Sequence, residues 1–201
     1  MATTAISAFK TALGGGGARP SLFDISVDIP AGLTALLGAG LTNQSVYKCN
    51  ISEIPGLTVT PIERQYFGRT VKIPGDITFA GTFSTTFINT EDFSIHTALN
   101  SWMALLNPDN NASYAKGSPQ DTESGWAGTV KLTQHSKQGV GGGLIEYTYE
   151  DCWPNNVSAI ELSYDSASTI EEFTVTWEYN YFHVGKGLSD ATTKEPIFDV
   201  V

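Results

Sequence analysis

Apolar and polar residues alternate with a period of two in several segments of this 201-residue chain, as they do in strands that bury one face. The clearest segment is EEFTVTWEYNYF, residues 171–182, whose predicted core face carries Phe173, Val175, Trp177, Tyr179 and Tyr181. SLFDISVDIP, residues 21–30, predicts a second strand that Pro30 ends. TVKLTQH, LIEYTYED and SAIELSY predict three more strands between residues 129 and 164, and GVGGG at 139–143 predicts a hairpin connection.

A long hairpin is predicted from about residue 57 to 73. Ile-Pro-Gly at 54–56 and Ile-Pro-Gly-Asp at 73–76 predict turns, and two extended limbs between them predict a reversal at Phe67-Gly68. The hairpin is long for one that packs only on its own core, and it carries charge at Glu63, Arg64, Arg69 and Lys72. A further strand is predicted after it, with Ile77, Phe79, Phe83 and Phe87 on one face.

One amphipathic helix is predicted among the strands, from about residue 91 to 106. Asn89 or Thr90 is the expected N-cap, and Glu91 and Asp92 fall in the expected first turn. The apolar stripe consists of Ile95, Leu99, Trp102 and Leu106. Such a helix should cover one face of a sheet. A shorter helix, with Ile6, Phe9 and Leu13 on one side, is predicted before the glycines at 14–17.

These elements predict a mainly β protein, an antiparallel sandwich or barrel with one flanking helix. We expect a flexible N-terminal arm at residues 1–18, a β domain at 19–182 and a C-terminal tail without a clear element at 183–201. Residues 107–125 are expected to form a surface loop, since they are rich in Asn, Ser, Pro, Gly and Asp. Residues 31–45 are small, apolar and punctuated by Gly, and a loop is the default assignment for them.

The composition argues against nucleic-acid recognition and leaves two explanations of a low-charge surface open. Charged residues make up 16% of the chain, whereas about 25% is usual in soluble proteins. The surface is therefore covered either by neutral Thr-rich strand faces or by other protein subunits. The net charge of −10 argues against an outward DNA-binding surface, which needs clustered Lys and Arg. An acidic surface lets DNA pass without adhering.

The search for catalytic chemistry returns little. The three histidines have no paired spacing, and His96 is expected on a helix face. Neighbouring acids in strands point to opposite faces, so spacing alone does not pair them, although distant strands could still supply a glycosidase pair. GVGGG lacks the Lys-Ser/Thr ending of a phosphate loop. The aromatic rows, from Tyr147 to Tyr181, could form a sugar- or base-stacking platform, but their period of two favours a core face. We expect no catalytic residues, metal or cofactor.

Cys49 and Cys152 stand in no metal-binding spacing, and we interpret them as reduced core residues. The N-terminal residues do not resemble a secretion signal, and no apolar run is long enough to cross a membrane.

Four segments follow one another along the chain. They are GARPSLFDISVDIP at 17–30, IPG followed by GRTVKIPGDITF within 54–79, SIHTALNSWMALL at 94–106, and residues 153–182, which contain Trp-Pro-Asn-Asn-Val, an Asp-Ser turn and the alternating aromatic strand. This ordered set resembles the tail tube proteins of contractile-tailed bacteriophages. Residues before Arg19, residues after Phe182 and the 31–45 segment match no part of that pattern.

The resemblance implies two packed antiparallel sheets with a flanking helix, and hexameric rings that stack into an inner tube for DNA passage. It implies a virion tail protein that is assembled in the host cytoplasm. The implied partners are other copies of the chain, the sheath, the baseplate or tube initiator, the tape measure protein and the tail terminator, with DNA only as a non-specific passenger and no membrane.

Two groups of residues are hypothesised to serve assembly. The first group lies on the hairpin arm and consists of Arg64, Tyr66, Phe67, Arg69 and Lys72. The arm would reach a neighbouring subunit, and its cations Arg64, Arg69 and Lys72 would pair with acidic groups of that neighbour. The second would make turns that set the register of residues 159–164 against 171–182: Trp153, Pro154, Asn156 and Asp165.

Other functions remain open at this point. The chain could be the tube subunit of a tailocin or of another contractile injection system, which the sequence does not separate from a phage tail. A carbohydrate-binding β-sandwich would use the aromatic rows, and an enzyme is a further alternative.

Overall fold

The computed structural model describes residues 2–13, 17–30, 48–106, 126–137, 143–165, 168–186 and 196–200. The helices are α1 (Ala2–Ala12) and α4 (Ser94–Leu106). The strands are β1 (Phe23–Asp28), β2 (Cys49–Ser52), β3 (Leu57–Tyr66), β4 (Arg69–Phe79), β5 (Thr82–Ile88), β6 (Gly128–His135), β7 (Gly143–Val157), β8 (Glu172–Glu178), β9 (Tyr181–Lys186) and β10 (Pro196–Val200). The expected loops at 31–45 and 107–125 lie outside the described residues.

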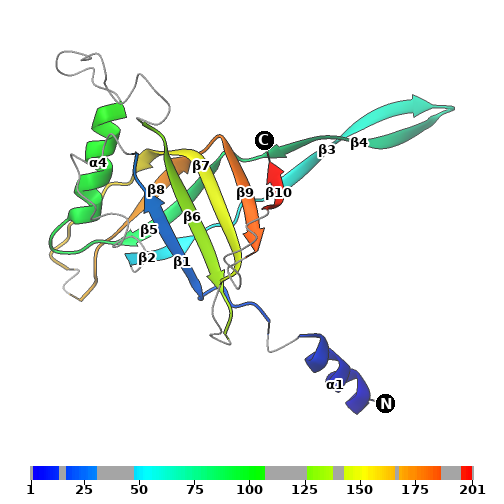
Figure 1. The fold of residues 1–201 in the computed structure, drawn as a ribbon, viewed down its shortest axis with the longest axis horizontal. Helices are drawn as coiled ribbons and strands as arrows, with labels where there is room; N and C mark the ends of the chain where they lie inside the picture. Colours follow the sequence, from blue (N-terminus) through cyan, green and yellow to red (C-terminus); the bar gives the residue numbers. More distant parts are fainter. Residues whose placement is uncertain are drawn as a thin grey trace.

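The β body is one antiparallel sheet folded into two packed halves (Figure 1). Its strand order is β1-β6-β7-β8-β5-β2, with β9 paired to β7 and β10 paired to β9. The long strand β7 belongs to both halves, because its first part pairs with β6 and β9 whereas residues 153–157 pair with β8. This arrangement confirms the predicted pair of antiparallel sheets with a flanking helix.

Strand β7 bends at Asp151, where it passes from one half to the other. Asp151 has a φ of 50°, in the left-handed region that few non-glycine residues adopt. Its carboxylate accepts a hydrogen bond from Asn180 Nδ2 at 3.4 Å. Asp tolerates this backbone better than most residues, so the bend is placed where the sequence can accommodate it.

The core lies between the two halves and is built mainly from aromatic side chains. Phe83 of β5 stacks on Tyr149 of β7, with ring centroids 4.1 Å apart and planes 14° from parallel. Trp177 of β8 is fully buried and donates its Nε1–H to Thr85 Oγ1 at 2.7 Å. Burial of a large side chain contributes about 1.5–3 kcal/mol, so these contacts hold the halves together.

Helix α4 packs its apolar stripe on the sheet, as predicted. Ile95, Leu99 and Trp102 are buried, and Leu106 packs against the core. The helix begins at Ser94 rather than near residue 91. Phe93 has a φ of 49° and interrupts the helical backbone. The predicted first-turn acids therefore precede the helix, and Asp92 contacts the Thr90 hydroxyl instead, which lowers the pKa of its carboxyl.

The predicted turn at residues 153–156 is wrong, since these residues continue β7. Pro154 is opposite Trp177, and a register shift between Pro154 and Asn156 marks a bulge. Bulges tolerate the missing N–H of proline, and the bend has already been made at Asp151. The predicted strand SAIELSY is wrong for the same reason: residues 158–163 are not in a strand, because residues 153–157 already occupy the edge of β8.

The aromatic segment at 171–182 divides into two strands rather than one. Strand β8 ends at Glu178, Tyr179 N donates to the Gly81 carbonyl at 3.0 Å, and β9 begins at Tyr181. The break shifts the alternation, so that Phe182 is buried and Tyr181 is only half-buried. The prediction that no element follows Phe182 is also wrong, because β9 continues to Lys186 and pairs with β10.

A similar break corrects the predicted strand after the hairpin. Strand β4 ends at Phe79 and β5 begins at Thr82, with Gly81 at a φ of 69° between them. Phe83 and Phe87 are buried as predicted, but the Ile77 side chain is 58% exposed. Ile77 therefore belongs to the hairpin that leaves the body, and not to the core face.

Candidate assembly interfaces

Strands β3 and β4 form a twisted two-stranded arm that extends away from the β body (Figure 1). They pair from Leu57↔Phe79 at the base to Tyr66↔Arg69 at the tip. Every residue of β3 is exposed, and so is every residue of β4 except Gly75 and Phe79. An isolated two-stranded hairpin is marginally stable in water, and within the described residues this arm packs little on its own body.

The tip of the arm is a two-residue turn at Phe67 and Gly68, as predicted. Their φ angles are 45° and 76°, and a type I′ turn requires positive φ at both central residues. Gly68 adopts this region without steric cost. Phe67 is held at the extreme end of the hairpin, where its side chain is 89% exposed.

The predicted turn at Ile-Pro-Gly-Asp 73–76 is wrong, since these residues lie inside β4. Pro74 is opposite Pro61, and the register shifts between Val59 and Pro61. Two prolines facing each other at an irregularity give up hydrogen bonds without breaking the hairpin. A Cβ at Gly75 would lie 2.5 Å from the Thr60 carbonyl oxygen, so the strands approach each other closely here. The arm therefore reaches Phe79 rather than ending near residue 73.

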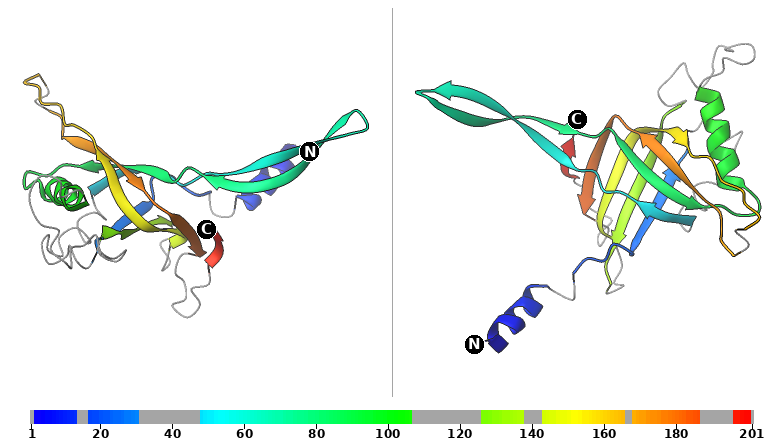
Figure 2. Two further views of the ribbon diagram at one scale, coloured as in Figure 1. Left: turned by 90° about the horizontal axis from the view of Figure 1, so that it is seen from above. Right: turned by 180° about the vertical axis from the view of Figure 1, so that it is seen from behind.

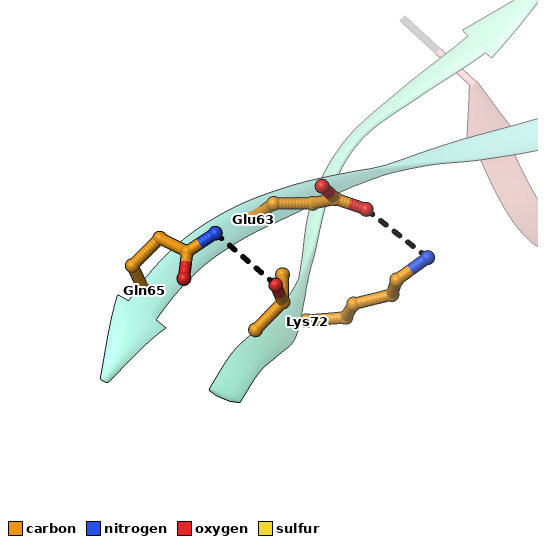
Figure 3. A network of polar contacts seen from close by, with 4 residues as sticks. Glu63, Gln65 and Lys72 are labelled. Carbon is orange, nitrogen blue, oxygen red and sulfur yellow. Dashed lines mark hydrogen bonds and ion pairs between the residues drawn. The ribbon is translucent and has the colours of Figure 1, made fainter. Parts of the chain in front are cut away.

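Polar contacts near the tip neutralise one of its three cations. Lys72 Nζ lies 3.0 Å from Glu63 Oε1, and Gln65 Nε2 donates to Thr70 Oγ1 at 3.3 Å (Figure 3). Arg64 and Arg69 have no ion-pair partner among the residues that the structure describes. Lys72 is therefore paired within the arm, whereas the two guanidinium groups are not paired with any acid of the described residues.

Apolar side chains are exposed along the whole arm. They are Leu57, Val59, Ile62, Tyr66, Phe67, Val71, Ile73 and Ile77. At the tip, the Tyr66 and Phe67 rings meet edge to face, with centroids 4.6 Å apart. Contiguous exposed apolar surface marks an interaction site. Sequence reasoning identified the aromatic and cationic residues here but not the aliphatic ones, although their alternation with polar residues is visible along both strands.

The edges of the folded sheet are further candidate interfaces. Within the described part of the chain, β1 pairs only with β6, β2 only with β5, and β10 only with β9. Edge strands present N–H and C=O groups that a second chain can pair with. Assembly through such edges would cover them.

The four residues predicted to set strand register are dispersed. Trp153 packs edge to face on Trp126, with ring centroids 5.2 Å apart, and Pro154 is buried beside β8. Asn156 is exposed opposite Thr176, and Asp165 lies in an exposed turn after Tyr164. Residues 153–157 pair with β8, and the role of these four side chains in selecting the register stays a prediction.

The described residues offer little for chemistry. Cys49 and Cys152 are free, and burial raises the pKa of both thiols, to about 12 for Cys49. Among these residues, no three His, Cys, Asp or Glu side chains gather as a metal site. Tyr149, Trp177 and Tyr179 are buried, so the aromatic rows form the core and not a sugar platform. No described helix combines the length and the apolar character needed to cross a membrane.

The residues that form the arm, the folded sheet and the flanking helix match the model of a known protein family. The family model for phage tail tube proteins matches residues 18–185. This chain belongs to the phage tail tube protein family. The match includes the arm and both halves of the sheet, and it excludes α1 and β10.

Curated relatives agree with this family. The chain is 24% identical to the tail tube protein gp19 of Enterobacteria phage T4 over 165 residues, which cover 82% of this chain and 90% of that protein. Tail tube proteins are structural subunits, and this chain is accordingly a structural protein rather than an enzyme.

Solved structures share the fold. One is the sheath–tube complex of an extracellular contractile injection system, with a TM-score of 0.52, 11% identity, and coverage of 88% of this chain and 97% of that one. Another is the tube-terminating cap of the anti-feeding prophage, with a TM-score of 0.54, 11% identity, and coverage of 85% and 91%. The chain is a tube subunit of a contractile tail or a related injection machine.

Proposed function

We propose that this chain builds the inner tube of a contractile phage tail, as hexameric rings that stack around a channel for DNA. The observation that carries the proposal is the arm of a family member, whose apolar side chains are exposed along both strands, although the body has a buried aromatic core. An arm of this length gains stability by packing on another copy. The low charge content of 16% suits a surface that other subunits cover.

The partners proposed for this tube are the tail sheath on its outside, the baseplate or tube initiator at one end and the terminator at the other. Relatives of similar fold come from a sheath–tube complex and a tube-terminating cap, which supports this choice. The tape measure protein and DNA would occupy the lumen in turn, and a net charge of −10 favours passage of DNA without adhesion. Assembly would take place in the host cytoplasm, before release of the virion.

A tailocin or an extracellular injection system is the second candidate, favoured by the same structural relatives. The two candidates differ in cargo, because only a phage tail conducts a genome. Purification of the native particle and a test for a DNA-filled capsid on its tail would separate them.

Electron microscopy of the purified chain tests the tube itself. The concentrated protein is imaged in negative stain, with light scattering on the same sample. Uniform tubes or stacked rings with a central hole are expected. If the chain is monomeric, preformed tube ends are added as seeds, and failure to elongate from them would overturn the proposal.

A variant of the arm tip links the tube to the arm. Phe67→Asp should abolish tubes while the unfolding curve of the monomer stays unchanged, because Phe67 is 89% exposed and contributes little to the core. Thr82→Asp is the matched control, an exposed β5 residue on the body. Equal tube yields from both variants would show that the arm tip has no role in assembly.

A further inference from the structure

A second apolar surface lies at the end of the molecule opposite the arm. Residues 158–165 and 168–171 lie between β7 and β8, and they and the β3–β4 arm project from opposite ends of the body (Figure 2). Three apolar side chains in these two ranges are largely exposed: Leu162 at 81%, Tyr164 at 106% and Ile170 at 73%. Because the two features project in opposite directions, a chain does not bring its own arm onto this surface.

The two segments between β7 and β8 enclose an open groove. The groove has a volume of about 570 Å³, and its apolar lining comes from Ile160, Leu162, Tyr164 and Ile170. A cavity of about 150 Å³ is enough to hold a benzene ring. The groove therefore has room for the aromatic pair at the arm tip, Tyr66 and Phe67.

The charges of the two surfaces are complementary. Residues 158–172 contain Glu161, Asp165, Glu171 and Glu172 and no Lys or Arg. Glu171 and Glu172 already accept hydrogen bonds from Asn89 and Asn50, at 3.0 and 2.9 Å. The carboxylates of Glu161 and Asp165 lie on exposed residues. Arg64 and Arg69 of the arm are exposed as well, and they carry the opposite charge.

We propose that the arm tip of one copy docks in the 160–172 groove of a second copy, with Tyr66 and Phe67 inside the groove and Arg64 and Arg69 against Glu161 and Asp165. The inference rests on the proposed function and names the surface that receives the arm. The contact joins two different patches, so it is heterologous and repeats along a ring or filament instead of closing a dimer. The aromatic anchors supply affinity, and the charges select the partner and its orientation.

Engineered cysteines test the contact directly. The full chain carrying Gln65→Cys and Ser163→Cys, which leaves the anchors Tyr66, Phe67 and Leu162 in place, is assembled, treated with a short bis-maleimide and run on a denaturing gel. A ladder of covalent multimers is expected from the double variant, whereas each single variant gives at most dimers and the parent chain gives monomer, because its own thiols are Cys49 and the buried Cys152. Tubes from the double variant without a ladder would overturn the docking.

Charge exchange provides a second test. Arg64→Glu with Arg69→Glu, and separately Glu161→Lys with Asp165→Lys, should each lower tube yield by about tenfold or more, since like charges then face each other. The combined variant should recover most of the yield. Recovery is the decisive result, because a merely misfolded variant would not be rescued by a second set of changes.

The outcomes separate the two proposals. If the parent chain forms no tubes even with seeds, the tube function fails and the docking fails with it. If tubes form but neither the ladder nor the charge rescue is seen, the docking alone is overturned and the arm has another receiving surface.

Discussion

Gly128 of β6 lies directly against the indole ring of Trp102 on α4. A Cβ atom at Gly128 would come within 2.7 Å of Trp102 Cη2 and within 2.6 Å of the Asp28 carbonyl oxygen. Trp102 also donates its Nε1–H to the Trp126 carbonyl at 3.0 Å, and its ring lies 6.0 Å from that of Trp177. Helix α4 therefore packs so closely on β6 that there is no room for a side chain larger than hydrogen at Gly128.

Gly128→Ala should destabilise the protein by about 1–3 kcal/mol, because the added methyl group overpacks this contact. Urea unfolding at a concentration where the chain is monomeric measures the change. Gly56→Ala is the control, since nothing lies within 4 Å of a Cβ at that position. Equal stability of the two variants would contradict the close approach of helix and sheet.

Thr85→Val should lower the free energy of unfolding by about 1–3 kcal/mol. The substitution keeps the shape of the side chain but removes the acceptor for Trp177 Nε1, which then remains buried without a partner. The same urea titration measures it, with the exposed Thr82→Val as the control, expected within about 0.5 kcal/mol of the parent chain. A neutral Thr85→Val would mean that the indole finds another acceptor.

Asp151→Ala should be less stable than Asp151→Gly by about 1–2 kcal/mol. Both variants lose the carboxylate contact with Asn180, but only alanine pays the steric cost of a left-handed backbone at this bend. Thermal and urea unfolding of the matched pair isolates the backbone effect. If alanine equals glycine, the bend is not held at positive φ in solution.

Alkylation of the native chain at pH 8 should be slow at both cysteines, and slower at Cys152. Burial raises the pKa of both thiols, to about 12 for Cys49, so little reactive thiolate is present at that pH. Cys152 is fully buried, whereas Cys49 is only half-buried. Mass spectrometry after iodoacetamide treatment counts the adducts, with urea-unfolded chain as the positive control. Rapid native labelling of Cys152 would contradict its place in the core.

Much of the fold follows from local patterns alone. The alternation at Phe23–Asp28 predicts β1, the stripe from Ile95 to Leu106 predicts α4, and Phe67-Gly68 predicts the tip of the arm. In each case the information is local: side-chain period identifies a buried face, and turn residues identify a reversal. The family resemblance also resides in the sequence, since the order of motifs survives where identity is only 24%.

Other features were decided only by the tertiary structure. Trp153 to Asn156 resembles a turn by composition, yet it continues β7 because the bend falls at Asp151 and β8 offers an edge to pair with. The aromatic alternation shifts between Tyr179 and Phe182 because the chain there leaves one half of the sheet for the other. Leu162, Tyr164 and Ile170 have the residue types of a core strand, but they are exposed. Alternation shows which side chains can share a face, whereas the closing of the sheet determines which faces meet and which are left for another subunit.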